Sequence, residues 1–263
     1  MLGSGSSGNC SLLRFNNKWC LIDCGLSLKQ TKMRMKVANL NISDINDLVL
    51  THLDYDHFNP AWCRAIQTHG ICVYTHKTHV KRALKTGIPK RNICEFEDTK
   101  FSFNGGTLQP IHVSHDALGT FCFVFDSGSQ RLGFATDLGH VPDKLIEKFI
   151  DLDIVAFESN YDPSMQLASR RPQFLKDRIM DGSGHLSNGQ SLKAIKTIAQ
   201  SSKLKHIILL HLSRQCNKAS LIRELYNEHC PDLVKLLTIS AQDYPSEMLK
   251  LKLPAQPEQL ALF

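Results

Sequence analysis

The feature that most constrains this chain is a dense run of histidines and aspartates that directly follows a short apolar segment. The segment 47–51 is typical of a buried strand, and His52, Asp54, Asp56 and His57 come immediately after it. Alternate side chains of an extended segment point to the same side. His52 and Asp54 are therefore expected to face one metal ion, and Asp56 and His57, in the turn that follows, a second. Imidazoles and carboxylates together suit zinc, iron or manganese. An Asp/His-rich surface loop is the alternative interpretation.

Three further candidate ligands each follow a strand-like run. His115 comes after Val113, Asp137 follows Phe134-Ala-Thr, and His211 follows the apolar run 207–210. A single histidine at the end of a strand is more often a hydrogen-bonded structural residue than a ligand. Three such positions in a chain that already has the dense run favour a site for two metal ions.

The order of the predicted elements indicates an α/β protein. Strands are expected at 10–15, 19–23, 47–51, 72–74, 153–157, 205–210 and 234–239, with short β runs throughout 93–135; helices are expected at 27–39, 60–68, 77–85, 142–150, 187–200 and 217–228. Two β-rich halves, each with helices, predict two sheets packed face to face and covered by helices. Residues 1–251 are expected to form one domain. Residues 252–263 contain two prolines and little core pattern, which predicts a flexible tail.

Composition excludes several protein classes. The 263 residues suffice for a large core, and 42% hydrophobic and 21% charged residues are ordinary for a globular protein. The first residues lack the basic and apolar regions of a signal peptide, and no apolar run is long enough to cross a bilayer. The nine scattered cysteines are therefore expected to be reduced thiols, and the protein to be cytoplasmic. The net charge of +6 permits a polyanionic partner such as DNA.

The motif H-x-[HD]-x-D-H, followed by a histidine, an aspartate and a histidine, resembles the metallo-β-lactamase fold, and most of all its WalJ/YycJ-type nuclease branch. The segments that carry the resemblance span nearly the whole chain: 6–9, 21–25, 52–57, 114–117, 135–139, 158–160, 184–188 and 211–214. The resemblance implies an αββα four-layer sandwich with two divalent metal ions at one edge. It implies a first site of His52, Asp54 and His115, a second site of Asp56, His57 and His211, and Asp137 between them.

Asp54 departs from the family motif, which usually has a histidine at this position. A carboxylate is a harder ligand than an imidazole, so Asp54 favours manganese or iron over zinc or weakens the first site. The alternative is that Asp54 is only a neighbour of the first site and leaves it partly empty.

Two metal ions can share a water, lower its pKa and present a bridging hydroxide to a phosphodiester. Asp56 is expected both to bind a metal ion and to orient that hydroxide. His185, just before a predicted helix, is expected to contact the scissile phosphate or to protonate the leaving oxygen, and a structural turn histidine is the alternative. The further candidates for contact with phosphate or substrate are Ser6, Ser7, Asn9, Asn160, Ser187 and Asn188, for which purely structural roles are the alternative.

Basic side chains recur at helical spacing in 77–85. Lys77, Lys81 and Lys85 share one face, with Arg82 beside them. A solvated helix face is the usual explanation for such a run. If the site cleaves nucleic acid, these four side chains are candidates for contacts with the DNA backbone.

The last five residues, 259–263, resemble the peptide by which bacterial proteins bind the DNA polymerase sliding clamp. Gln259 would supply directional hydrogen bonds, and Leu260, Leu262 and Phe263 would fill apolar pockets. The two prolines upstream hold the peptide away from the domain. The alternative is a hydrophobic terminus that packs on its own domain.

The metal motif and the tail together predict a metal-dependent DNA exonuclease in replication-linked repair, and the resemblance implies 5′-to-3′ action on double-stranded DNA. Two other functions remain open. One is a small-molecule phosphodiesterase that acts on cyclic ribose phosphates, which a narrow pocket without a basic groove would favour. The other is a clamp-binding module without catalysis, which a degenerate metal site would favour.

Overall fold

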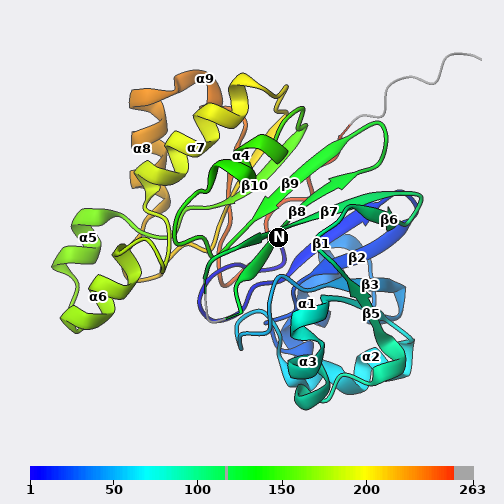
Figure 1. Cartoon of the computed structure of the whole chain (residues 1–263). Coiled ribbons are helices and arrows are strands. Elements are labelled where there is room, and N and C mark those ends of the chain that lie inside the picture. The colour runs from blue at the N-terminus through cyan, green and yellow to red at the C-terminus, as the bar shows by residue number, and fades with distance from the viewer. Residues whose placement is uncertain (116–117, 252–263) are drawn as a thin grey trace, which may run out of the picture.

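Two β-sheets pack face to face, and helices cover the outer side of each (Figure 1). The structure is a computed structural model, and it describes residues 1–115 and 118–251. The predicted α/β class and the αββα order of layers are confirmed. The predicted tail, 252–263, lies outside the described residues.

The first sheet is built from the N-terminal part of the chain, in the order β1-β2-β3-β4-β5. Its strands are β1 (Ser11–Phe15), β2 (Lys18–Ile22), β3 (Ile45–Val49), β4 (Cys72–His76) and β5 (Ile93–Phe96), and its helices are α1 (Leu28–Met35), α2 (Cys63–His69) and α3 (Val80–Thr86). A hairpin joins β1 and β2 through Asn16, whose φ of 52° suits a tight turn. The other strand pairs of this sheet are parallel.

The second sheet has the order β12-β11-β10-β9-β8-β7-β6. Its strands are β6 (Phe101–Phe103), β7 (Gly106–Val113), β8 (Thr120–Asp126), β9 (Arg131–Ala135), β10 (Ile154–Glu158), β11 (His206–Leu210) and β12 (Leu237–Ile239). Its outer side carries α4 (Asp143–Lys148), α7 (Asn188–Gln200), α8 (Ala219–His229) and α9 (Pro231–Val234). Strands β6 to β9 are antiparallel, and β9 to β12 are parallel.

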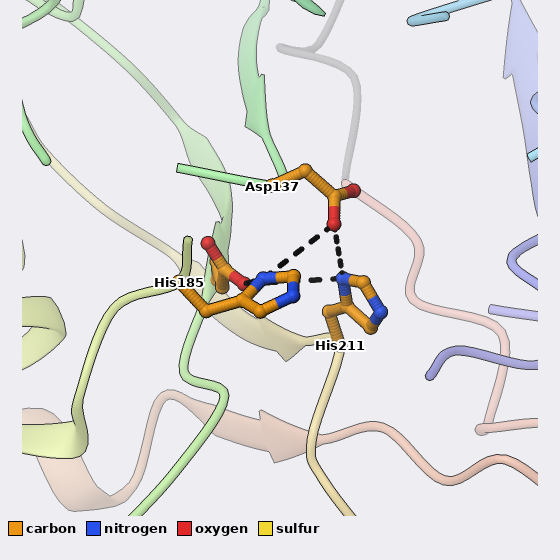
Figure 2. Close-up of side chains that lie close together, drawn as sticks. Asp137, His185 and His211 are labelled. Atoms are coloured by element: carbon orange, nitrogen blue, oxygen red, sulfur yellow. Dashed lines mark hydrogen bonds and ion pairs between the residues drawn. The ribbon is translucent and has the colours of Figure 1, made fainter. Parts of the chain in front are cut away.

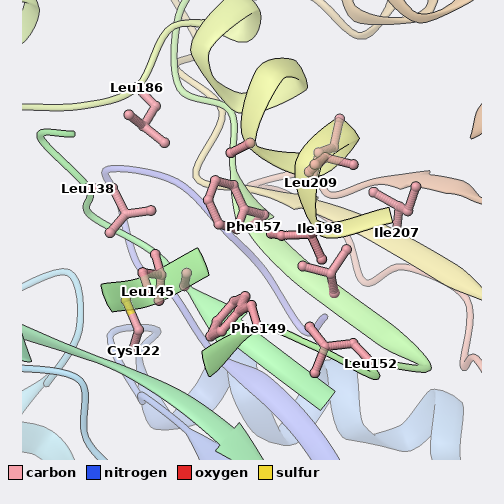
Figure 3. Packing of buried hydrophobic residues seen from close by; sticks show 14 of the residues in the cluster. Cys122, Leu138, Leu145, Phe149, Leu152, Phe157, Leu186, Ile198, Ile207 and Leu209 are labelled. Atoms are coloured by element: carbon pink, nitrogen blue, oxygen red, sulfur yellow. The ribbon is translucent and has the colours of Figure 1, made fainter. Parts of the chain in front are cut away.

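Strand β8 shows how one sheet serves two cores. Its side chains alternate between the two faces. Phe121, Phe123 and Phe125 enter the cluster between the sheets, while Cys122 and Val124 enter the cluster beneath the outer helices. Figure 3 shows this second cluster, in which Phe149 and Phe157 lie among aliphatic side chains from the strands and helices. Burial on both faces explains why the strand has an almost continuous apolar sequence.

Two short helices, α5 (Pro163–Ala168) and α6 (Gln173–Met180), interrupt the chain between β10 and α7 and were not predicted. They project from the body of the sandwich in Figure 1. The base of this excursion is closed by a bridge between Tyr161 and Ser187 and by a hydrogen bond from Asn188 N to Tyr161 O of 2.8 Å.

The cysteine prediction was wrong at two positions. Cys72 and Cys94 form a disulfide between neighbouring strands β4 and β5, with their Cα atoms 6.1 Å apart. Cys94 pairs with Tyr74, and Cys72 lies two residues before Tyr74 in β4. The two cysteines are therefore diagonal neighbours on adjacent strands. The other seven cysteines are free thiols, as predicted.

Among the described residues, no helix is both long and apolar enough to span a membrane.

Candidate metal centre

After β3, residues 52–57 form a tight loop that is hydrogen-bonded to the segments before β1 and after β2. The backbone N–H of Asn9 donates to Asp56 O at 2.6 Å, and the backbone N–H of Cys24 donates to His57 O at 2.8 Å. Gly25 lies directly against the loop, because a Cβ atom there would overlap the carbonyl group of Asp56. The close approach possible at this glycine therefore sets the height of the loop above the sheet.

The predicted ligands of the first site lie together. His52, Asp54 and His115 each offer an atom, and these atoms lie within 4.8 Å of one another. The His52 Nδ1 atom lies 3.0 Å from Thr51 Oγ1 and 3.1 Å from Thr120 Oγ1. The His52 Nε2 atom is buried, has no hydrogen-bond partner among the described residues, and lies 3.8 Å from Asp54 Oδ2. We refer to these three residues as the first cluster.

The predicted ligands of the second site, Asp56, His57 and His211, form the second cluster. The Asp56 Oδ2 atom lies 3.6 Å from both His57 Nε2 and His211 Nε2. The fully buried Asp23 fixes His57, because its Oδ2 atom lies 2.7 Å from His57 Nδ1. This contact places the Nδ1 proton toward Asp23 and leaves Nε2 to face the cluster.

Asp137 lies between histidines contributed by both sheets. Its Oδ2 atom is 2.9 Å from His57 Nε2. Its Oδ1 atom is 2.7 Å from His211 Nδ1, a contact drawn in Figure 2. The carboxylate also belongs to a group with His52 and His57, so it adjoins the first cluster as well. Asp137 and His211 both have a positive φ, of 56° and 54°. Such a backbone is uncommon outside glycine and is found both in turns and at functional sites.

The electrostatics of these buried groups follow from their neighbours. Burial favours the neutral form of His57, but the adjacent Asp137 and Asp23 carboxylates outweigh it and raise its pKa well above the usual value. The pKa of His211 is likewise raised to about 9, because Asp137, together with Glu158 and Asp56, outweighs the effect of burial. His52 has no such carboxylate at hydrogen-bonding distance, so burial and the nearby His57 lower its pKa. The pKa of Asp137 lies well below its usual value, because His211 and His57 outweigh the effect of burial.

His185 lies beside this centre, in contact with a glutamate that the prediction of site residues missed. The His185 Nδ1 atom is 2.7 Å from Glu158 Oε1 and 3.6 Å from Asp137 Oδ1. Glu158 is fully buried and accepts a second hydrogen bond, of 2.6 Å, from Leu138 N. Asp23 was missed as well. The signal available for both was an acidic residue at the end of an apolar strand, inside a segment that carries the family resemblance.

Arg82 does not lie on the solvated face with the other basic residues. Its Nη2 atom donates to Asp54 Oδ1 at 2.7 Å, so it is directed at the first cluster. Lys81 and Lys85 are exposed, and Lys77 pairs with Glu97 at 3.2 Å. The structure thus separates Arg82 from the three lysines with which it was grouped.

Most candidates for substrate contact are used inside the protein. The side chain of Asn9 lies 3.0 Å from His57 Nε2, and Asn160 Nδ2 donates to His211 O at 2.7 Å. Ser187 caps α7, and the buried amide of Asn188 bonds to Ser159 and Asn217. These four residues position the loops of the centre rather than face solvent. Ser6 and Ser7 are exposed at its margin.

The residues present fit a pair of divalent ions. The Nε2 atoms of His52 and His211 and the Nδ1 atom of His115 are buried without a hydrogen-bond partner among the described residues. Unpaired buried polar atoms are costly, and coordination would satisfy them. The carboxylates of Asp54, Asp56 and Asp137, which adjoin these histidines, would balance the positive charge of the ions.

Comparisons of sequence agree with this geometry. The family profile "Beta-lactamase superfamily domain" matches residues 18–211. The chain is 31% identical over 227 residues to exodeoxyribonuclease YycJ of Bacillus anthracis, which covers 85% of each chain. It is 29% identical over 224 residues to exodeoxyribonuclease WalJ of Streptococcus pneumoniae, which covers 82% of each.

Solved structures show the same fold at lower identity. The metallo-β-lactamase fold protein YhfI of Bacillus subtilis superimposes with a TM-score of 0.68 at 14% identity and covers 92% of this chain and 95% of its own. The short form of human tRNase Z gives a TM-score of 0.63 at 15% identity, with 95% and 98% covered. Both chains match almost from end to end, so the fold extends over the whole domain.

Proposed function

This chain belongs to the beta-lactamase superfamily of metallo-β-lactamase-fold hydrolases, and we propose that it is a metal-dependent exonuclease. The proposed enzyme degrades double-stranded DNA from 5′ to 3′ and acts in replication-linked repair. The observation that carries the proposal is the combination of two adjacent ligand clusters with the resemblance to two exodeoxyribonucleases over most of the chain. Such an enzyme would act in the cytoplasm.

The assignment of ligands is part of the proposal. His52, Asp54 and His115 would hold one ion and Asp56, His57 and His211 the other, with Asp137 between them. The bound ions, Zn²⁺, Mn²⁺ or Fe²⁺, would supply an activated water and neutralise charge on the phosphoryl oxygens.

The remaining steps belong to side chains of this chain. The Asp56 carboxylate, whose Oδ2 atom lies 3.6 Å from both His57 Nε2 and His211 Nε2, would accept a hydrogen bond from the attacking water and so orient it. His185 would donate a proton from Nε2 to the leaving oxygen, since its Nδ1 atom is held by Glu158. The Glu158 carboxylate would stabilise the imidazolium form of His185 before the proton is transferred.

The test is a nuclease assay with wild-type protein and Asp56→Ala across several divalent metals. A duplex labelled at the 5′ or the 3′ end reports the polarity of degradation. We expect wild type to release nucleotides from the 5′ end, and Asp56→Ala to lose at least roughly a hundredfold in rate. Asp232→Ala, an exposed aspartate on α9, is the matched control and should retain the wild-type rate.

The substrate panel separates the proposed function from its alternatives. Besides duplex DNA it contains single-stranded DNA, structured RNA and a cyclic ribose phosphate. A ribonuclease Z of Agathobacter rectalis is 27% identical over 178 residues, which is the reason to include RNA. Protein that hydrolyses a small phosphodiester but no DNA with any metal would disprove the nuclease. Fewer than one bound metal per chain under all conditions would favour a module without catalysis.

We further propose that the tail binds the DNA polymerase sliding clamp through Gln259, Leu260, Leu262 and Phe263, which lie outside the described residues. Tethering to the clamp would raise the concentration of the nuclease at replicating DNA. Deletion of residues 259–263 should abolish clamp binding in a pull-down with purified clamp and leave turnover of free DNA unchanged. Gln256→Ala, in the same tail, is the control, and retained binding by the deletion variant would refute the proposal.

A further inference from the structure

Besides the metal centre, a pocket that can bind an anion lies where the loop between α5 and α6 meets Gln215. The pocket has a volume of about 390 Å³ and is lined by Ser169, Arg170, Arg171 and Gln215. A volume of this order accommodates a nucleotide-sized group. We propose that this pocket, the arginine pocket, binds a backbone phosphate of the DNA strand whose neighbouring linkage is cleaved at the metal centre. The inference rests on the proposed function, because it assigns a contact to the same substrate.

The arginine pocket lies next to the metal centre. Arg171 Nη2 donates to Ser213 Oγ at 3.2 Å, and Ser213 is two residues beyond His211. Asn160 joins the two, since its carbonyl accepts from Ser213 N at 2.8 Å and its amide donates to His211 O at 2.7 Å. Two residues span at most about 7 Å of chain, and a DNA strand carries a phosphate about every 3.4 Å along the helix axis. Because these two lengths are comparable, we expect a strand bound at the metal centre to have a phosphate within a few nucleotides of the pocket.

The guanidinium of Arg171 is held in a fixed position. Its Nε atom donates to Gln215 Oε1 and its Nη1 atom to the fully buried Gln166 Oε1, both at 3.2 Å. With the bond to Ser213, three of its five N–H groups are used, and two remain for a ligand. Fixing the side chain before binding removes part of the entropy cost of a later contact.

Within the part of the chain that the structure describes, no carboxylate neutralises the positive charge of the arginine pocket. All three acceptors of Arg171 are uncharged, and within residues 1–115 and 118–251 no carboxylate lies at ion-pair distance from Arg170 or Arg171. Arg170 is exposed. Guanidinium, hydroxyl and amide groups are the donors that proteins most often direct at phosphate oxygens. The chemistry of the lining thus matches a phosphodiester rather than an uncharged ligand.

The fold supports this placement. The excursion begins after Glu158 at the carboxyl end of β10, the edge of the sheet at which Asp137 and His211 also lie. Parallel strands β9, β10 and β11 end together there, so a segment inserted after β10 starts at the same edge of the sheet as Asp137 and His211. Figure 1 shows α5 and α6 projecting from the sandwich. A strand of DNA held by α5 and α6 would reach the metal ions without crossing the sandwich.

The test measures binding of the metal-loaded protein to a fluorescein-labelled duplex with phosphorothioate linkages, which resists hydrolysis. Fluorescence anisotropy measures Kd at a series of KCl concentrations from about 50 to 200 mM. The variants are Arg170→Gln and Arg171→Gln, and the matched control is Arg223→Gln, an exposed arginine on α8. Metal content and thermal unfolding of each variant show that the fold and the metal centre are intact.

We expect Arg170→Gln and Arg171→Gln each to weaken binding roughly tenfold, as for the loss of a charge-assisted hydrogen bond. Each should reduce the slope of log Kd against log salt by about one unit, while Arg223→Gln changes Kd less than about twofold. Equal Kd values for all three variants, in a protein that degrades DNA, would overturn the arginine pocket and leave the nuclease intact. A metal-loaded wild type that neither binds nor degrades DNA would refute the nuclease, and the pocket with it.

Discussion

At the scale of single residues, Asp54 is the position where this chain differs most from the motif it resembles. One carboxylate oxygen accepts from Arg82 at 2.7 Å, and the other lies 3.8 Å from His52 Nε2. Arg82 therefore turns Oδ2 toward the first cluster and leaves one oxygen available there. A histidine at this position could not form an ion pair with Arg82, so we interpret Asp54 and Arg82 as a pair.

Replacing Asp54 by Asn tests whether this carboxylate is a ligand. The amide keeps the shape of the side chain but removes the negative charge that a divalent ion requires. We expect the metal content to fall from about two ions per chain to about one. Mass spectrometry of the purified protein measures it, with Asp232→Asn as the control. Two ions retained by Asp54→Asn would show that Asp54 is only a neighbour of the site.

Glu158 and His185 should act as one unit, because their contact is 2.7 Å and Glu158 is fully buried. Loss of a carboxylate that orients a histidine typically costs about 10- to 100-fold in activity. We expect Glu158→Gln and His185→Asn each to lower kcat on a small phosphodiester by this factor, and the double variant to be no worse than His185→Asn. Losses that multiply in the double variant would mean that the two residues act independently.

At the scale of elements, the strand ends and the loops between them place the site. The sequence predicted candidate ligands at strand ends, because strands are short apolar runs and polar residues follow them, and the structure brings these segments together. It did not predict α5 and α6, which have six and eight residues and expose Leu167 and Phe174. Helices this short carry too little periodic pattern to be recognised.

Contacts between distant residues were equally hidden from the sequence. Arg82 and Asp54 are 28 residues apart, and His185 and Glu158 are 27 apart. Its place in the basic run 77–85 grouped Arg82 with the lysines, although its partner Asp54 lies on another segment. The Cys72–Cys94 disulfide depends in the same way on which strands pair. Such contacts follow from the packing of the layers, which no local pattern specifies.

Gly25 and Gly189 offer a comparison at this scale. A methyl group at Gly25 would overlap the Asp56 carbonyl, whereas a methyl group at Gly189, in α7, would have no neighbouring atom within 4 Å. We expect Gly25→Ala to lower the free energy of unfolding by about 1–3 kcal/mol or more and to displace Asp56. Gly189→Ala should raise it by about 0.5–1 kcal/mol. Urea denaturation measures both changes, and equal values would disprove the assigned contact.

At the scale of the whole molecule, the candidate metal centre joins the two halves of the sandwich. His52, Asp54, Asp56 and His57 come from the half that contains the first sheet, and His115, Asp137 and His211 come from the half that contains the second. The ions would therefore bind only the assembled sandwich. A ligand that binds the folded state alone stabilises it by mass action.

Removal of metal should consequently lower the thermal stability of the whole domain. For a site occupied at about 100 times its Kd the stabilisation is about 2.7 kcal/mol, which corresponds to roughly 5–10 °C in Tm for a chain of this size. Calorimetry before and after treatment with a chelator measures the shift, and added metal should restore it. Asp56→Ala should show a smaller shift, and an unchanged Tm in wild type would contradict the assignment of the clusters.

The closed base of the α5–α6 excursion has a consequence for how such enzymes diverge. The chain leaves the sandwich at Tyr161 and returns at Ser187, and these two residues pair with each other. Apart from Leu186, what lies between them contributes little to the three large apolar clusters. Residues 162–183, which include α5 and α6 and end before His185, are thus free to lengthen, shorten or change their charge during evolution while Glu158, His185 and His211 stay in place. Selection for a new polymer or a smaller substrate would act first on residues 162–183, and grafting them between relatives should transfer substrate preference without altering the chemistry.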